Sequence, residues 1–326
     1  MAATFSPGDA TQTAGRFGFD SLASWAMVPE GGTKKVILTG GAGLALRPTT
    51  AGVVALSETS TTAGREIVIT GSRLGTVRLE AQDSSGRAQA TLEISVKRRR
   101  TISTFIHFVF DRSNRSTQLG LSDAVQMMDV VNKLLLPQAN VMLSRRDSGG
   151  VNLPYEMERG LLLTANPYKA LKSNQSWQRK IAGPLPCISR QPLGPAGCMP
   201  ETVQGNLTQA EFDDIRSFNM IAGILTHLDP SSNYNLFFVS RFDEPPGAFT
   251  GAFSPTDPNG TILNACIVHA GVRGQGLAHE LCHFLLNGAT FLDSSGHSRG
   301  VNDLMKASPG QFDIFIPKNQ ANFINP

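Results

Sequence analysis

The stretch His279-Glu280-Leu281-Cys282-His283 decides how this 326-residue chain is interpreted. Apolar residues surround it at helical spacing, and the pair Asn287-Gly288 that follows is a typical helix stop, so we expect the stretch to lie on a helix. Residues four apart share one face of a helix, which lets the two histidines present their imidazole nitrogens to a single zinc ion. The glutamate between them can then reach a water molecule on that ion. The spacing therefore predicts two metal ligands and a base within one helical turn.

A third ligand is expected downstream, because a catalytic zinc takes three protein ligands and leaves its fourth position to water. No glutamate follows Glu280, so a later glutamate cannot complete the site. Four candidates remain: Asp293, His297, Asp303 and Asp313. We favour His297, because imidazole is a preferred zinc ligand and because the residues before it form turns readily. Asp293 is the alternative.

The order of these residues resembles the metzincin clan of zinc peptidases. In that clan HExxH is followed by a glycine turn, a third histidine and a methionine-containing turn beneath the metal. Here Gly288, His297 and the segment Asn302-Asp303-Leu304-Met305 follow in the same order. The resemblance implies a zinc peptidase in which Glu280 is the general base. The zinc ligands that it implies are His279, His283 and His297.

Two features differ from the usual pattern of that clan. The spacing HExxHxxGxxH would place glycine at 286 and histidine at 289, but the chain has Leu286 and Ala289 there, so the loop to His297 is eight residues longer. No tyrosine follows Met305, so the extra tyrosine ligand of some clan members is not expected. Met305 itself can also be explained as a core methionine that fills a gap, which is the commoner role of methionine.

We expect residues 98–326 to form an α+β catalytic domain like that of the zincins and metzincins, with a mixed sheet, a backing helix and the active-site helix. Residues 121–136 have the spacing of an amphipathic backing helix that ends at Pro137. Three segments are typical of strands: 105–110, 139–143 and 234–240. By the resemblance, residues 247–253 form the rim of the cleft and pair with the backbone of a peptide substrate.

The first third of the chain has a different pattern, typical of an all-β sandwich. Five β-rich runs are separated by Gly, Ser, Thr and Asp turns: 35–38, 53–56, 66–69, 76–80 and 88–96. The phrase from Gly75 to Val96 resembles the last strands of bacterial immunoglobulin-like domains. We therefore predict a tail over residues 1–19 and an antiparallel immunoglobulin-like sandwich over residues 20–97.

The basic run Lys97-Arg98-Arg99-Arg100 lies at the boundary between the two predicted domains. We interpret it as a solvated linker; a processing site and a nucleic-acid contact are the alternatives. Because the cluster is isolated and the formal net charge is only +3, we expect no nucleic-acid partner. No apolar run approaches the length of a membrane span, so we expect no transmembrane segment either.

The amino terminus lacks the basic start and apolar stretch of a secretory signal. We still expect a secreted or exported protein, either with its signal removed or delivered by a route that needs none, as a bacterial effector would be. The N-terminal sandwich would then meet an export machinery or a surface partner. Cys187 and Cys198 lie in a Pro- and Gly-rich segment, where a disulfide between them would help to order the chain.

Two functions are compatible with these features. The first is a zinc-dependent endopeptidase that cleaves protein or peptide substrates with a zinc-activated water, with Glu280 as the general base. The alternative is a non-catalytic binding or adhesion protein that contains a degenerate zincin module with a structural zinc. The intact glutamate beside the two histidines favours the enzyme, because a structural site needs no base.

Overall fold

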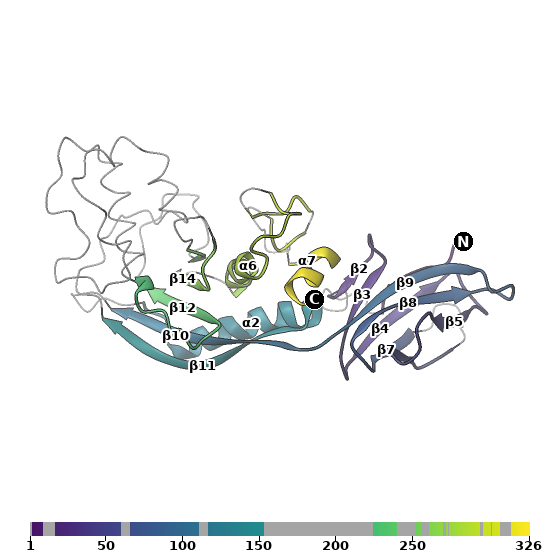
Figure 1. Ribbon diagram of the computed structural model, residues 1–326, viewed down its shortest axis with the longest axis horizontal. Coiled ribbons are helices and arrows are strands. Elements are labelled where there is room, and N and C mark those ends of the chain that lie inside the picture. Colours follow the sequence, from purple (N-terminus) through teal and green to yellow (C-terminus); the bar gives the residue numbers. More distant parts are fainter. Residues whose placement is uncertain are drawn as a thin grey trace. The chain divides into compact units, whose positions relative to one another are not determined.

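The computed structural model describes most of the chain outside one long central segment. The described residues are 2–8, 17–59, 66–110, 117–152, 224–239, 252–255, 261–269, 272, 274–293, 296–300, 302–306 and 314–326. They form two compact units, which Figure 1 shows coloured along the chain. The first unit contains residues 1–101, 131–142 and 289–326, and the second contains residues 102–130 and 143–288.

Two β-sheets make up the N-terminal part of the first unit. The first sheet has the order β1 (Thr4–Pro7), β4 (Thr33–Thr39), β7 (Glu66–Gly71) and β6 (Val54–Leu56), and all its pairs are antiparallel. The second has the order β2 (Phe19–Asp20), β3 (Trp25–Pro29), β9 (Ala88–Lys97), β8 (Gly75–Gln82) and β5 (Ala45–Pro48). Along β7 the two isoleucines are buried and their neighbours are partly exposed, which is the alternation expected of a strand with one face on a core.

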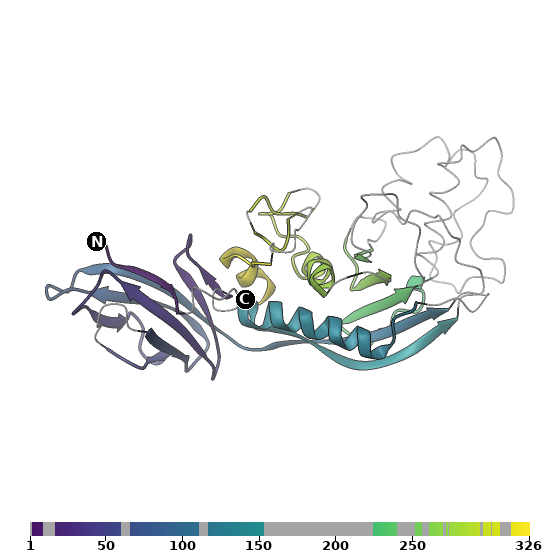
Figure 2. The ribbon, with the colours of Figure 1, turned by 180° about the vertical axis from the view of Figure 1, so that it is seen from behind.

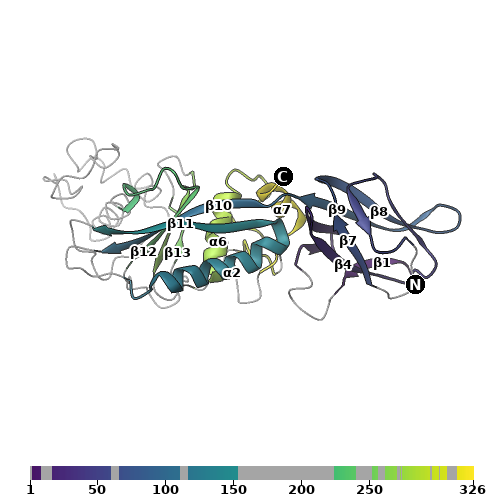
Figure 3. The ribbon, with the colours of Figure 1, turned by 90° about the horizontal axis from the view of Figure 1, so that it is seen from below.

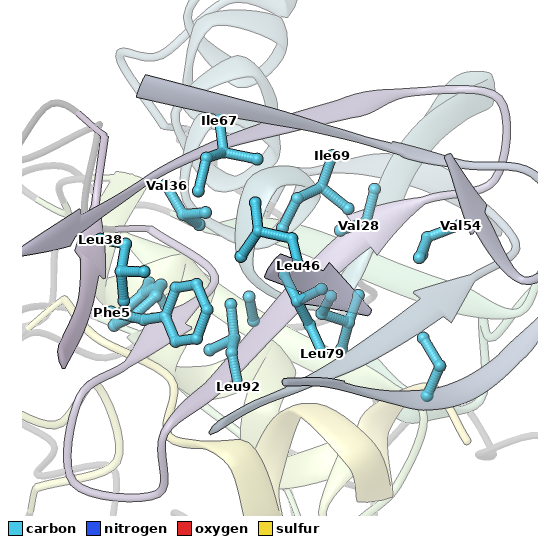
Figure 4. Close-up of a cluster of buried hydrophobic side chains, with 14 of the residues drawn as sticks. Phe5, Val28, Val36, Leu38, Leu46, Val54, Ile67, Ile69, Leu79 and Leu92 are labelled. Atoms are coloured by element: carbon cyan, nitrogen blue, oxygen red, sulfur yellow. The ribbon is translucent and has the colours of Figure 1, made fainter. Parts of the chain in front are cut away.

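The buried side chains of the two sheets meet in a single apolar core. Figure 4 shows the side chains of the first sheet next to those of the second. The first sheet contributes Phe5, Val36, Leu38, Ile67 and Ile69, and the second contributes Val28, Leu46, Leu79 and Leu92. Burial of each such side chain contributes about 1.5–3 kcal/mol relative to exposure, so this contact is the main source of stability of the sandwich.

Strands occupy all five runs predicted in this region, but the pairing differs from the prediction in one place. Strand β3 pairs with β9 in parallel, with Trp25 opposite Glu93 and Val28 opposite Val96, whereas an antiparallel sandwich was expected. A parallel pair needs a crossover, and the chain supplies it by leaving β3 for β4 in the opposite sheet. Strand β1 also lies within the residues that were predicted to be a tail.

The second unit is built on a five-stranded sheet in the order β11-β10-β12-β14-β13. Its strands are β10 (Arg100–Phe110), β11 (Val141–Asn152), β12 (Tyr234–Val239), β13 (Ala252–Phe253) and β14 (Ala265–His269). Strands β10, β12 and β14 are parallel, and the short β13 pairs antiparallel with β14 at one edge. All six residues of β12 are buried, as is typical of a parallel strand with both faces covered.

Three helices are described: α2 (Leu121–Ala139), α6 (Gly274–Leu285) and α7 (Lys318–Ile324). Figures 1 and 2 show α6 and α2 on the same side of the five-stranded sheet. Helix α6 packs on β14 and β13, and the ring of its Phe284 lies 5.4 Å from the ring of Tyr234 on β12. No helix in the described part of the chain is both long and apolar enough to cross a lipid bilayer.

Helix α6 begins at Gly274, which lies close against Val130 and Met127 of α2. Figure 3 shows the two helices crossing. A Cβ atom at position 274 would overlap the Cβ of Val130 and would lie 3.0 Å from the carbonyl oxygen of Met127. Neither atom is the far end of a flexible side chain, so the two helices can meet here only at a glycine. This contact sets where the predicted active-site helix begins.

We expect Gly274→Ala to destabilise the protein by about 1–3 kcal/mol, because one helix must move to accept the methyl group. Urea unfolding followed by circular dichroism measures this change. Gly120→Ala is the matched control, since a Cβ there would meet Asp123 only at an ordinary 3.7 Å. Equal stability of the Gly274→Ala and Gly120→Ala proteins would show that the close contact is unimportant.

Helix α2 does not end at Pro137 as predicted but continues to Ala139. The proline removes one hydrogen bond of the helix, and Gln138 ties the following turn to another segment. The side-chain amide nitrogen of Gln138 donates to the carbonyl oxygens of Leu134 at 2.8 Å and Ile314 at 2.9 Å. Its side-chain oxygen accepts from the backbone N–H of Ile316 at 2.8 Å. The proline is tolerated because the two bonds to residues 314 and 316 hold the last turn.

The basic run at residues 97–100 agrees only in part with the predicted solvated linker, because its three arginines are exposed but Lys97 is buried. Strand β9 ends at Lys97 and β10 begins at Arg100, so only two residues join them. Lys97 is 5% exposed, and its ammonium group donates to the carbonyl oxygen of Asn325. Arg100 donates to the carbonyl oxygen of Ile324. Both cations therefore bind the C-terminal end of α7, where the helix dipole favours positive charge.

Asn325, at the end of α7, bonds in turn to the residues that follow β9 and to the end of α2. Its side-chain amide donates to the carbonyl oxygens of Arg98 at 2.9 Å and Ala139 at 2.8 Å. Asn140, which follows α2, in turn donates from its side chain to the carbonyl oxygen of Lys97 at 2.7 Å. Hydrogen bonds thus join three segments of the first unit: the last strand of the sandwich, the end of α2 and the end of the chain.

We expect Asn325→Ala to lower the free energy of unfolding by about 1–3 kcal/mol, because it leaves buried carbonyl groups without their donor. Thermal or urea unfolding gives the value. Asn319→Ala is the control, because Asn319 lies in α7, the helix that Asn325 caps, with an exposed side chain. Similar stabilities for the two variants would contradict the role assigned to Asn325.

Candidate metal centre

Helix α6 carries the HExxH run, as predicted from the sequence. Four apolar residues of the helix are buried and hold it on the sheet: Leu277, Ala278, Leu281 and Leu285. Gly288 has a φ of +83°, which an L side chain rarely adopts, and it ends the helical segment as expected. His279, Glu280 and His283 are 3%, 8% and 9% exposed, so the polar residues of the run are buried too. Such burial requires polar partners for these groups.

The two histidines of α6 face each other. Their Nε2 atoms lie 3.0 Å apart, and their rings are perpendicular with centroids 4.6 Å apart. Two nitrogen ligands at about 2.0–2.1 Å from one tetrahedral zinc lie about 3.3 Å from each other. The observed separation is close to that value, so one ion can bind both imidazoles with little movement.

His297 brings a third imidazole to the same place. One ligand atom from each of His279, His283 and His297 lies within 4.8 Å of the others. Across the ranges that the structure describes, this is the one group of three or more His, Cys, Asp or Glu side chains arranged to hold a metal ion. The three histidines could therefore bind a metal, and nitrogen donors of this kind suit zinc and other borderline transition metals.

The other ligand candidates in the described residues, Asp293 and Asp303, use their carboxylates for hydrogen bonds with the chain. Asp293 Oδ1 accepts the backbone N–H of His297 at 3.0 Å, and its carbonyl accepts from Gly296 at 2.9 Å, so this aspartate shapes the predicted turn. Asp303 accepts hydrogen bonds from two other groups and is 3% exposed. Asp313 lies outside the described residues, as do Cys187 and Cys198, for which a disulfide was predicted.

Burial lowers the pKa of His297 below its usual value, while the nearby Asp293 carboxylate raises it. The burial effect is the larger of the two, so the imidazole tends to stay neutral. Only the neutral imidazole has a free nitrogen lone pair for a metal. The surroundings of His297 are therefore suited to a ligand.

Met305 is fully buried close to this loop. Its carbonyl oxygen accepts the backbone N–H of Ser298, the residue after His297, at 2.7 Å. Asn302, three residues earlier, has a φ of +59°, which makes the segment turn sharply. The segment 302–305 is thus a tight turn bonded to the loop of His297. Its likeness to the methionine-containing turn of metzincins stays a prediction.

Glu280 is held by Ser254, a residue that the sequence analysis did not single out. The Ser254 hydroxyl donates to the backbone carbonyl oxygen of Glu280 at 2.9 Å. Burial raises the pKa of the Glu280 carboxyl to about 7, and hydrogen bonds from Ser254 lower it in part. The only sequence signal for Ser254 was its place directly after the predicted rim segment 247–253, of which residues 252 and 253 form the edge strand β13.

Two more polar side chains lie buried near Glu280, namely Tyr234 on β12 and Cys266 on β14. Burial is the main cause that raises the pKa of each well above its ordinary value, and the charge of Glu280 raises both further. The thiol of Cys266 therefore stays protonated, as expected of a cysteine that packs and does not react. Cys282 is likewise buried and forms no disulfide.

Comparisons with known proteins do not identify a family. No protein-family model matches the chain, and no curated protein matches it. A solved structure of a Bacteroides ovatus GH5 xyloglucanase in complex with a XXXG heptasaccharide aligns with 90% of this chain, at 10% identity and a TM-score of 0.24. The chain covers 58% of that protein. A similarity this low supports no conclusion about fold or function, so the metzincin and immunoglobulin-like resemblances stay predictions.

The geometry predicts that His297→Ala weakens metal binding far more than Asp293→Ala. The first removes a ligand, whereas the second removes only one hydrogen bond of the turn that carries it. Competition for zinc(II) with a chromophoric chelator measures both dissociation constants. A larger loss for Asp293→Ala would make the carboxylate the third ligand.

Proposed function

We propose that the protein is a zinc-dependent endopeptidase. The observation that supports this most directly is the combination of three clustered histidines with a buried carboxylic acid on the same helix as two of them. A purely structural zinc site takes four protein ligands and needs no acid beside them. Three histidines would instead leave one position of a tetrahedral ion for water or substrate.

The chain has the side chains that peptide hydrolysis requires. His279, His283 and His297 would hold the zinc, which when bound supplies a Lewis acid that activates water and polarises the scissile carbonyl. Glu280 would take the proton from the attacking water and later deliver it to the leaving amine. Because α6 places Glu280 one residue from His279, the base and the first ligand move as one rigid body. The Ser254 hydroxyl donates to the backbone carbonyl oxygen of Glu280 and so ties Glu280 to the edge of the sheet.

The edge strand β13 is the place where we expect the substrate. It is the last strand of its sheet and is hydrogen-bonded to β14 on one side. An extended peptide can add to such an edge through main-chain hydrogen bonds, which do not depend on the side chains of the peptide. Ser254 follows β13 directly and touches Glu280, so a peptide bound there would lie near the proposed base.

Replacement of Glu280 tests this mechanism. Glu280→Gln keeps the size of the side chain but cannot accept the proton, so cleavage should fall by about 10²–10⁴-fold. Zinc content, measured by atomic absorption, should remain one ion per chain. Unfolded casein and a quenched-fluorescence peptide library serve as substrates.

Gln275→Ala is the control, because Gln275 lies on the same helix but has no part in the proposed mechanism. Unchanged cleavage by Glu280→Gln would exclude Glu280 as the base. A zinc ion bound by four protein ligands, with no cleavage by the unaltered protein, would favour the non-catalytic alternative with a structural zinc.

A further inference from the structure

The loop of His297 is largely exposed, and its described contacts tie it to the turn beside it and to α7, where the ring of Phe323 meets that of Phe291 at 5.8 Å. His279 and His283 are fixed by a packed helix, but residues 290, 291 and 293 before His297 are exposed, as are residues 299 and 300 after it. The backbone bond from Ser298 to the carbonyl oxygen of Met305 ties this loop to the turn 302–305. Ser298 and Lys306 also form a parallel bridge.

Asp303 holds that turn in place and connects it to the end of the chain. Its Oδ1 accepts the backbone N–H of Met305 at 2.8 Å, and its Oδ2 accepts the side-chain amide of Gln320 on α7 at 2.8 Å. Two backbone bonds add to this link. Leu304 donates to the carbonyl oxygen of Phe315 at 2.8 Å, and Phe315 donates to that of Asn302 at 3.0 Å.

The same C-terminal segment is bonded on its other side to the sandwich. Asp20 on β2 accepts the backbone N–H of Lys318, the first residue of α7, at 3.0 Å. The ammonium group of Lys318 pairs with Glu93 on β9 at 2.8 Å, and the ring of Phe17 meets the ring of Phe315 edge-on at 5.8 Å. Figures 1 and 2 show α7 beside β2 and β3.

We infer that the N-terminal sandwich supports the metal centre by positioning its third ligand, His297. The support passes from the sandwich through α7 and Asp303 to the turn 302–305, and from there to the loop of His297. Asp20, Gln320 and Asp303 are positioning residues, since none of them belongs to the cluster of histidines. Groups that orient metal ligands from a distance commonly change metal affinity by 10–100-fold when replaced.

This role differs from that of an independent binding module. An appended module meets its neighbour through few contacts, so changes inside it leave the metal site untouched. Here the sandwich, the end of α2 and residues 289–326 form one compact unit. The inference concerns metal binding alone, so its test does not depend on whether the protein cleaves peptides.

The test measures the zinc dissociation constant of the full-length protein by chelator competition, well below the unfolding temperature. Asp303→Ala should weaken zinc binding about tenfold or more. Gln320→Glu places a second carboxylate against that of Asp303 and removes the donor, so it should also weaken binding. The double variant with Asp303→Asn and Gln320→Glu restores a donor facing an acceptor and should return the affinity to within about twofold of the original.

Asp20→Asn tests the link at the sandwich, with Asp83→Asn as the matched control. Each aspartate accepts turn N–H groups with Oδ1 and one further donor with Oδ2: Lys318 for Asp20, and Gln89 for Asp83. Asp83 lies in the turn before the ten-residue β9, about 30 Å along the strand from Lys97. Asp20→Asn should weaken zinc binding about three- to tenfold, and Asp83→Asn should leave it unchanged.

Two outcomes would overturn the inference. One is an unchanged zinc affinity of the Asp303→Ala protein. The other is an equal loss of affinity in Asp20→Asn and Asp83→Asn, because the sandwich would then act only through its general stability. Recovery in the double variant together with a loss confined to Asp20→Asn would support it.

Discussion

The burial of polar side chains on helix α6 is the constraint on which the rest of the site depends. His279, Glu280 and His283 leave water together when α6 packs on the sheet. Each such group loses several kcal/mol of hydration unless it finds a partner. The two imidazoles lie in a geometry that one metal ion satisfies, and the Glu280 carboxyl forms hydrogen bonds with Ser254. The apolar residues of α6 position the helix, and the polar residues decide what it can bind.

A second constraint acts on the loop that carries His297. A loop holds a ligand precisely enough for a metal only when neighbouring structure fixes it. Asp303 and Gln320 provide this through bonds that lead to α7, and Asp20, Lys97 and Asn325 tie α7 to the sandwich. The predicted boundary at residues 97 and 98 therefore falls within a continuous set of hydrogen bonds.

Much of the local structure could be predicted from the pattern of residues. The five strand runs of the sandwich are present because alternating apolar residues encode a strand with one buried face. The helix of the HExxH run and its end at Gly288 followed from helical spacing and a glycine with positive φ. His297 was preferred over Asp293 on ligand chemistry, and it lies with His279 and His283 in a group that could hold a metal ion. Ser254 and Gln320 could not be predicted, because no local pattern marks a residue whose partner is distant in the chain.

The sequence by itself determined which segments are strands and helices and that one helix carries two histidines and a glutamate on neighbouring turns, because these properties depend on residues close together in the chain. Tertiary structure decided the parallel pairing of β3 with β9, the continuation of α2 past Pro137 and the burial of Lys97. Each depends on partners far along the chain; Lys97 and Asn325 are 228 residues apart. A hydrogen bond or close contact over such a separation forms only after the chain has folded, so no short stretch of sequence encodes it.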